Sequence, residues 1–313
     1  MANSKQKVDI SIRREGMDFV SPLMTASGTF GYGDEYDGLC DYSLIGAVVT
    51  KSLSLLPRVG NPPPRICETS GGGAINSIGL ANPGVDEFIA SKLPILPVSK
   101  TKIYLSLVGE TVEEFVTLVE KLELVQSISG YELNISCPNV RRGGIDMGAD
   151  SQAVTAIVGA VRAATDRFFS VKLTPNQPDI GRLAESAAKA GANALTLVNT
   201  LFGMSIDTEK RRPKLGSITG GYSGPPIKPV ALASVYKAAQ VVDIPIWASG
   251  GIVSGKDGID FLLAGATTLQ LGTVLFVDPQ APVRIMREMV DYCKRHNIKA
   301  ITELIGALDT NVH

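Results

Sequence analysis

The sequence has few residues of the kinds that hold metal ions or iron–sulfur clusters. Its four cysteines show neither CxxC spacing nor metal-type pairing: Cys40, Cys67, Cys137 and Cys293. Because zinc sites and clusters need closely spaced ligands, we expect no metal site held by this chain alone. The only two histidines, His296 and His313, lie near the C-terminal end, so we expect no catalytic histidine in the loops. Scattered cysteines also fit a reducing compartment, and we expect a cytoplasmic protein.

Long apolar runs and an excess of either charge are also missing. No apolar stretch reaches the roughly 18 residues that a membrane span needs. The start, MANSKQKVDI, has no apolar segment behind its polar opening, which argues against a secretory signal. Lys plus Arg total 30 against 31 Asp plus Glu, a formal net charge of −1. We therefore expect neither nucleic acid nor a membrane as a partner.

The composition is that of a folded protein with a sizeable core. Hydrophobic residues make up 44% and charged residues 19%, which argues against disorder. The 32 glycines suggest that many backbone positions need positive φ or approach a ligand closely. A length of 313 residues allows one large domain or two small ones. Since no recognisable linker divides the chain, we expect a single domain over residues 1–313.

Short apolar, β-branched segments alternate with helix-like stretches along the chain. Strands are expected to begin at Leu23, Ala47, Lys102, Tyr131, Phe168, Ala194, Pro245 and Thr267. Helical patterns between them include Val112–Leu124, Gln152–Ala164, Ile180–Ala190, Pro229–Gln240 and Gly255–Ala264. Apolar strands that alternate with helices indicate a parallel sheet buried on both faces. Eight such units favour a closed α/β barrel, the (β/α)8 or TIM barrel.

Two further segments and one alternative complete the fold prediction. VDISIR and MDFVSP are expected to form a β-hairpin before the barrel, and the Gly- and Pro-rich segment Leu53–Pro83 is expected to be a long loop insertion after the second strand. A connection of that length is usually a lid or a binding loop. The alternative, a doubly wound dinucleotide-binding sheet, needs GxGxxG after an early strand, and SGTFGYG lacks that spacing.

Polar and glycine residues recur where the expected strands end, which is where barrel enzymes carry their active sites. The glycine loops SGGIVSG and LGTVLF favour phosphate binding through backbone N–H groups, although glycine also serves in simple tight turns. Lys51 and Lys172 each end a strand, and a lysine aimed into a barrel mouth is costly unless an anion meets it. Beside a flavin, such a lysine would stabilise the charge that accumulates on reduction. A solvated lysine at a strand end is the alternative.

Cys137, in ELNISCPN, follows the fourth expected strand. A free cysteine has a pKa of about 8.5, so a thiolate there could act as a base or a nucleophile. The alternative role, a small buried hydrophobe, is the one we assign to the other three cysteines. The amides of four asparagines could bind a small cyclic amide or imide, although a lone asparagine is usually a turn residue: Asn76, Asn134, Asn139 and Asn199.

Several motifs together resemble the class 1 dihydroorotate dehydrogenases over nearly the whole chain: ASGTFG, TKSLSLLPRVGNPPPR, NSIGLANPG, ELNISCPNV, SVKLTPN, VNTLFG, GGYSGPPIKP and ASGGI. SGPPIKP, and the absence of LPPY after Val171-Lys172, make the chain most similar to the catalytic subunit of the NAD-linked type 1B enzymes. The resemblance implies a barrel that binds FMN and oxidises (S)-dihydroorotate to orotate in pyrimidine synthesis. A fumarate-linked type 1A homodimer and an FMN barrel for a related dihydropyrimidine remain alternatives.

The resemblance also implies roles for individual residues. Cys137 would be the base that takes a proton from C5 of the substrate while C6 gives a hydride to flavin N5. The implied FMN contacts are Ser27, Lys51, Ser52, Ser106, Asn134, Lys172, Val198, Gly224, Gly250, Gly251, Gly272 and Thr273. The implied substrate contacts are Lys51, Asn76, Ser77, Ile78, Gly79, Leu80, Asn134, Asn139, Asn199 and Thr200.

Type 1B barrels pass electrons to a partner subunit that holds FAD and a [2Fe–2S] cluster and reduces NAD. Because this chain has neither cluster-spaced cysteines nor a dinucleotide fingerprint, we expect that iron–sulfur subunit to be a separate polypeptide around a homodimeric core, in a heterotetramer. The sequence departs from the family pattern at Ser106, where an asparagine is usual, and at Trp247 and Ser249, where we expect smaller or different residues.

Overall fold

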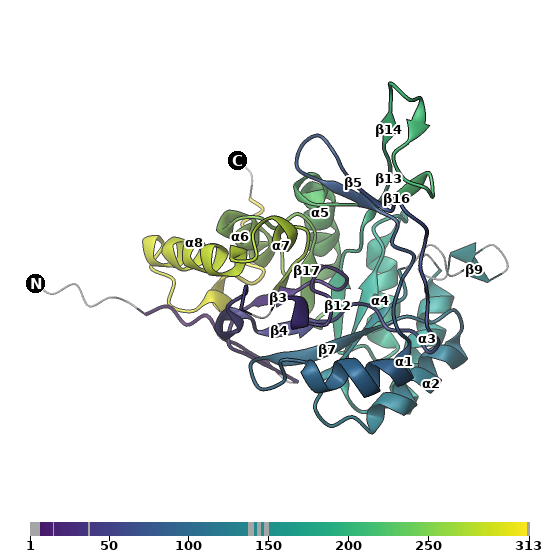
Figure 1. Ribbon diagram of the computed structural model, residues 1–313. Coiled ribbons are helices and arrows are strands. Elements are labelled where there is room, and N and C mark those ends of the chain that lie inside the picture. The colour runs from purple at the N-terminus through teal and green to yellow at the C-terminus, as the bar shows by residue number, and fades with distance from the viewer. Residues whose placement is uncertain are drawn as a thin grey trace, which may run out of the picture.

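A closed barrel of eight parallel strands forms the centre of the structure, a computed structural model (Figure 1). The structure describes residues 7–14, 16–36, 38–136, 141–142, 145–146 and 150–311. In order around the barrel, the strands are β3 (Leu23–Thr25), β4 (Ala47–Val49), β7 (Lys102–Leu107), β8 (Gly130–Asn134), β11 (Phe168–Leu173), β12 (Ala194–Leu197), β17 (Ile246–Ser249) and β18 (Thr268–Leu271). Each lies in a segment expected to be a strand, so the predicted barrel is confirmed.

Helices surround the barrel (Figure 1). Five match the expected stretches to within two residues at each end: α2 (Val112–Glu123), α3 (Ser151–Ala164), α4 (Ile180–Lys189), α5 (Lys228–Ala239) and α6 (Gly255–Leu263). Four of them begin after a residue whose side chain accepts a first-turn N–H, a favourable N-cap: Thr111, Asp150, Asp179 and Ser254. The helices α1 (Val85–Glu87), α7 (Val274–Val277) and α8 (Ala281–Arg295) lie beyond the stretches named above.

The N-terminal hairpin closes the end of the barrel where the strands begin. Its strands β1 (Ile12–Arg14) and β2 (Met17–Phe19) pair antiparallel, as predicted. Trp247 stacks on Phe168 with ring centroids 5.8 Å apart, and it meets the edges of Tyr104 at 5.0 Å and Phe19 at 6.4 Å. The indole N–H points to Met17 Sδ at 3.3 Å. Trp247 is therefore the centre of an aromatic plug, which accounts for a large side chain at this position.

The long insertion after β4 contributes to a second sheet rather than forming a simple loop. Four strands pair antiparallel, in the order β13 (Leu201–Met204), β16 (Thr219–Ser223), β6 (Ala74–Asn76) and β5 (Ile66–Glu68). The predicted insertion is confirmed, and its strands β5 and β6 join a segment that follows β12. Two further hairpins are β14 (Ile206–Asp207) with β15 (Arg212–Pro213), and β9 (Arg141–Arg142) with β10 (Ile145–Asp146). In Figure 1 the β14 hairpin projects furthest from the barrel.

The barrel interior changes from aromatic to polar along its axis. Alternate residues of each strand face the barrel axis. Residues two positions apart on one strand therefore belong to successive layers of the interior. Above the plug lies a layer of polar side chains from four strands, joined by hydrogen bonds: Glu132, Ser170, Thr196 and Gln270. Layers in such barrels are usually filled by branched apolar residues. This polar layer lies directly below the carboxyl ends of the strands, where the predicted site residues gather.

Candidate functional site

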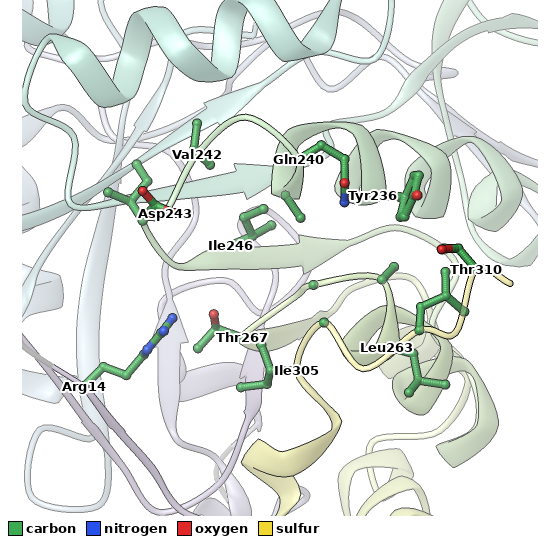
Figure 2. A pocket seen from close by; sticks show the side chains of 16 residues that line it. Arg14, Tyr236, Gln240, Val242, Asp243, Ile246, Leu263, Thr267, Ile305 and Thr310 are labelled. Atoms are coloured by element: carbon green, nitrogen blue, oxygen red, sulfur yellow. The ribbon is translucent and has the colours of Figure 1, made fainter.

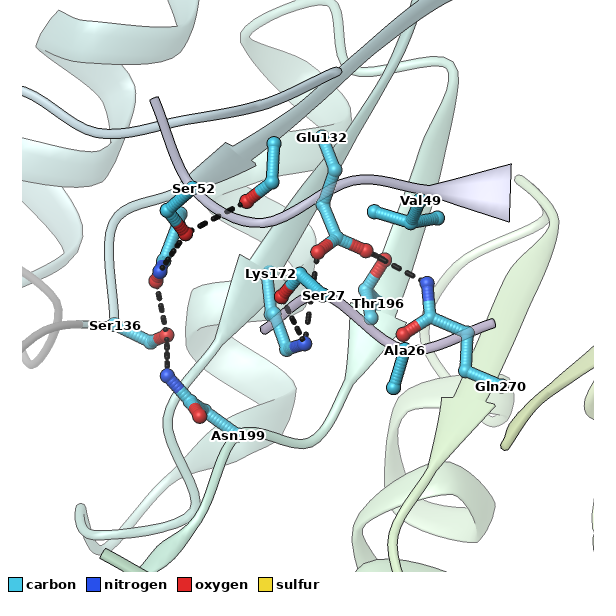
Figure 3. Close-up of polar contacts among 12 residues, drawn as sticks. Ala26, Ser27, Val49, Ser52, Glu132, Ser136, Lys172, Thr196, Asn199 and Gln270 are labelled. Atoms are coloured by element: carbon cyan, nitrogen blue, oxygen red, sulfur yellow. Dashed lines mark hydrogen bonds and ion pairs between the residues drawn. The ribbon is translucent and has the colours of Figure 1, made fainter. Parts of the chain in front are cut away.

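A chain of polar side chains joins four barrel connections at the carboxyl ends of the strands (Figure 3). Ser52 Oγ lies 2.9 Å from Ser106 Oγ and accepts a hydrogen bond from Asn134 Nδ2 at 3.1 Å. Ser136 Oγ donates to Asn134 Oδ1 at 2.8 Å and accepts from Asn199 Nδ2 at 2.6 Å. Since both atoms of the Asn134 amide have partners, its orientation is set by its neighbours. The chain thus holds two predicted ligand-binding amides, those of Asn134 and Asn199.

A second network surrounds Lys172, which is 3% exposed. Its ammonium donates to Ser27 Oγ at 3.1 Å and lies 3.5 Å from Glu132 Oε1 (Figure 3). The other carboxylate oxygen, Oε2, accepts from Thr196 Oγ1 at 2.9 Å and from Gln270 Nε2 at 2.7 Å. Two predicted cofactor residues, Ser27 and Lys172, are therefore in contact, and a buried carboxylate meets the lysine from the polar layer.

Two glycine loops after β17 and β18 present unused backbone donors. The N–H groups of Gly250, Gly251, Gly272 and Thr273 donate no hydrogen bond to any residue that the structure describes. Thr273 Oγ1 lies 2.9 Å from Ser223 Oγ, which joins this region to the end of β16. Gly251 has φ +76°, and a Cβ there would lie 2.8 Å from the Cβ of Lys228, so only glycine fits. Unpaired backbone donors from neighbouring strands are what an anion such as phosphate requires.

Two predicted cofactor residues lie beside these loops without offering a side-chain donor. Val198 is buried, and its N–H donates to Ser249 O at 2.9 Å, which links the ends of β12 and β17. Gly224 is buried, with φ +94°, next to the insertion sheet, where a Cβ would lie 3.0 Å from Gly72 O. In the structure, Val198 and Gly224 therefore contribute to the shape of the barrel mouth rather than a hydrogen-bonding side chain.

Lys51 follows β4 and is half-buried. Burial lowers the pKa of its ammonium below the ordinary lysine value, the positive charge of Arg65 lowers the pKa further, and Glu35 opposes this change. Within the described part of the chain, its side chain forms neither a hydrogen bond nor an ion pair. An unpaired ammonium in this position is suited to an anionic ligand.

The predicted substrate segment, residues 76–80, continues from β6. Asn61 fastens it, because its Nδ2 donates to Ser77 O at 2.8 Å and its backbone N–H donates to Ile78 O at 3.0 Å. Ser77 Oγ is buried and has no hydrogen-bond partner among the residues described. Gly79 and Leu80 both have positive φ, 74° and 59°, which is rare for leucine. An orphaned hydroxyl and a strained leucine are typical of a ligand-binding segment.

Some site predictions fall outside the described residues, and some residues of the site were not predicted. Cys137 and Asn139 lie outside the residues that the structure describes. No sequence motif assigned a role to Glu132, Ser136 or Gln270, although a charged residue within the apolar strand YELNIS is an unusual pattern. The remaining predicted residues lie at the carboxyl ends of the barrel strands, on the connections that follow them or on the insertion sheet, and their assignment to ligands stays a prediction.

A separate cavity of about 410 Å³ lies at the opposite end of the barrel, where β17 and β18 begin (Figure 2). Its lining includes Arg14, Tyr236, Asp243, Ile246 and Thr267. None of the predicted site residues lines it. No helix in the described part of the chain is long and apolar enough to cross a membrane, and the described residues contain no group of three or more His, Cys, Asp or Glu placed to hold a metal ion.

The fold and this polar mouth define the class: an α/β-barrel enzyme in which glycine loops with unpaired N–H groups and two lysines lie at the carboxyl ends of the strands. The family model for dihydroorotate dehydrogenase matches residues 10–292. The catalytic subunit of dihydroorotate dehydrogenase B (NAD(+)) from Geotalea daltonii is 49% identical over 302 residues, covering 96% of this chain and 99% of the relative. The chain belongs to the dihydroorotate dehydrogenase family.

Two further comparisons concern a second relative and a solved structure. The corresponding catalytic subunit from Geobacter sulfurreducens is 48% identical, covering 97% of this chain and 99% of its own. A crystal structure of DHODH in complex with ferulenol from Eimeria tenella aligns with a TM-score of 0.79 at 20% identity, covering 98% of this chain and 90% of that one. At that identity the structural match supports the barrel fold alone.

Proposed function

We propose that this chain oxidises (S)-dihydroorotate to orotate at the carboxyl end of the barrel, with FMN as its resident cofactor, in pyrimidine biosynthesis in the cytoplasm. Electrons leave through a separate subunit that carries FAD and a [2Fe–2S] cluster and reduces NAD. The relatives named as NAD(+)-linked catalytic subunits support this route over the fumarate-linked alternative. The observation that carries the proposal is the set of four unpaired N–H groups at Gly250, Gly251, Gly272 and Thr273.

The donor set fits an FMN molecule in two respects. The four N–H groups suit the phosphate, whose negative charge backbone amides bind well. Lys172, with Ser27 beside it, supplies a cation for the polar edge of the ring, and Ser52, Ser106 and Asn134 supply neutral partners nearby. Bound FMN supplies a hydride acceptor, which no amino acid side chain provides.

The substrate is a cyclic imide that carries a carboxylate, and we assign its partners by charge. The unpaired ammonium of Lys51 meets the carboxylate, and the amides of Asn76, Asn134, Asn139 and Asn199 meet the imide groups. The chain through Ser136 holds two of these amides in one orientation before substrate arrives. Such preorganisation reduces the entropy that binding must overcome.

Cys137 is the proposed base, and it takes the proton from C5 as the C6 hydride departs. The C5 hydrogen leaves as a proton and the C6 hydrogen leaves with its electron pair. The electrons of the broken C5–H bond form the new C5–C6 double bond. A thiol suits this task because its ordinary pKa, about 8.5, is close enough to neutral pH for a thiolate to form.

The experiment is an anaerobic reduction of the purified chain. We expect a yellow protein with FMN bound that bleaches when dihydroorotate is added, and NAD reduction only when an iron–sulfur flavoprotein subunit is also present. Bleaching by dihydrouracil but not by dihydroorotate would contradict the proposed substrate. A colourless protein that binds no added FMN would contradict the proposed cofactor.

A further inference from the structure

The Glu132 carboxylate lies inside the barrel with no exposed surface. Its strand neighbours Tyr131 and Leu133 point into the apolar layer between the barrel and the helices, while Glu132 faces the barrel axis. Three strands contribute its partners: Thr196 Oγ1 at 2.9 Å, Gln270 Nε2 at 2.7 Å and Lys172 Nζ at 3.5 Å. A whole layer of the barrel is thus organised around one negative charge.

Stability alone does not explain this arrangement. Removing a carboxylate and an ammonium from water costs several kcal/mol for each ion, and apolar residues of similar volume often stabilise a fold as well or better. The geometry is also incomplete, because Glu132 Oε1 has no hydrogen-bond partner in the described part of the chain apart from the lysine 3.5 Å away. A role at the site above offers a better explanation than a role in folding.

The position of Lys172 connects this charge to the mouth of the barrel. The ammonium has three N–H donors, and Glu132 and Ser27 are the partners that the structure gives it. One donor is left for a ligand, and the lysine is held between the polar layer below and the loop after β3. Any change in the Glu132 carboxylate therefore acts on the direction of the Lys172 ammonium and on the local charge together.

We infer that Glu132 is a positioning residue of the flavin site, which holds the Lys172 ammonium at the barrel mouth and uses its own charge to set how readily the bound flavin accepts electrons. This inference rests on the proposed FMN site. Reduction adds negative charge to the flavin, which the ammonium favours and the carboxylate opposes. The interior of the barrel is poorly screened, so both effects are larger than in water.

The chain contains a matched control for this role. Glu123 also accepts hydrogen bonds from two hydroxyl groups, Thr165 Oγ1 at 2.6 Å and Tyr131 Oη at 2.8 Å, and its Oε1 lies 3.3 Å from Arg167 Nε. It lies at the opposite end of the barrel, where β8 and β11 begin. Its loss disturbs a similar network without altering the charge near the mouth.

The test compares Glu132→Gln and Glu123→Gln with the wild-type chain, each saturated with FMN. The readouts are the midpoint potential of the bound flavin and the dissociation constant of sulfite, an anion that adds to oxidised flavins. Removing one negative charge should tighten sulfite binding about tenfold and raise the potential by the equivalent of about 30 mV for a two-electron couple. Glu123→Gln should change neither readout.

An unchanged or lower potential in Glu132→Gln would overturn the inference. If that variant does not fold, Glu132→Asp keeps the charge but withdraws it from Lys172 by one methylene group, and a smaller rise in potential is then expected. An Asp variant with the wild-type potential would equally overturn it. If the wild-type protein bleaches with dihydroorotate but Glu132→Gln has the wild-type flavin potential, the proposed function stands and only this inference fails. Wild-type protein that binds no FMN removes both.

Discussion

The amide of Asn199 donates to the hydroxyl of Ser136 at 2.6 Å and so joins the loop after β12 to the loop after β8. Ser136 in turn donates to Asn134 Oδ1 at 2.8 Å. This small side chain is 3% exposed, and it holds two proposed ligand-binding amides in one arrangement.

Replacing Ser136 with alanine should weaken substrate binding. The two asparagine amides lose a shared partner, and a buried polar group without a partner costs about 1–3 kcal/mol. We expect the KM for dihydroorotate to rise about tenfold, measured by steady-state reduction of an artificial acceptor. Ser186→Ala, on the surface of α4, is the control and should behave as wild type. An unchanged KM in Ser136→Ala would show that the chain does not orient the substrate amides.

Replacing Gly251 with alanine should reduce FMN binding. The residue has φ +76°, and the added Cβ would meet Lys228, so the loop after β17 must move. The left-handed conformation alone costs alanine about 1–2 kcal/mol. The ratio of flavin absorbance to protein should fall several-fold after gentle purification. Gly159→Ala is the control, because nothing lies within 4 Å of that position in α3, and it should stabilise the fold by about 0.5–1 kcal/mol. Full flavin content in Gly251→Ala would exclude this loop from the cofactor site.

Substrate affinity should depend on pH through Lys51. Its ammonium is the form that binds a carboxylate, so affinity is full below its pKa and is lost as pH rises through it. Because burial and the charge of Arg65 lower this pKa, the loss should begin at a lower pH than for an ordinary lysine. Lys51→Met should raise KM about 10- to 100-fold and remove the pH dependence, as expected for one charged hydrogen bond. Lys51→Arg should move the rise in KM to higher pH. A wild-type pH profile in Lys51→Met would contradict the assignment.

Replacing Cys137 with alanine should slow the reduction of bound FMN by dihydroorotate about 10²- to 10⁴-fold, the usual contribution of a general base. The measurement is stopped-flow bleaching without oxygen, together with the flavin content, which should not change. Cys67→Ala, on β5, is the matched control and should bleach at the wild-type rate. Equal rates in the wild type and Cys137→Ala would remove the base from the proposed mechanism.

Replacing Trp247 with alanine should destabilise the fold without changing the flavin site. The side chain is fully buried, and such truncations cost about 3–5 kcal/mol. We expect the midpoint of urea unfolding to fall, followed by circular dichroism because Trp247 is the only tryptophan in the chain. The absorption spectrum of bound FMN should match wild type, since the plug lies at the other end of the barrel. A changed spectrum would show that the plug and the mouth are coupled.

The sequence by itself determined the barrel, because short apolar, β-branched segments that alternate with helix-like stretches are local patterns. It also located the strand ends, and with them Lys51, Lys172 and the glycine loops, since parallel strands bring their carboxyl ends together. Family motifs added the roles of Cys137 and the asparagines, which no local pattern specifies.

Only the tertiary structure decided which of these side chains touch. Ser136 and Asn199 are 63 positions apart, and Gln270 and Glu132 are 138 apart, so their contacts exist only because the barrel closes. The sequence presented Trp247 as an unexplained departure, and the closed barrel turned it into the centre of a plug. Glu132 was hidden for the same reason. The sequence shows a charge within an apolar strand, but the closure of eight strands decides that this charge is buried and which side chains meet it.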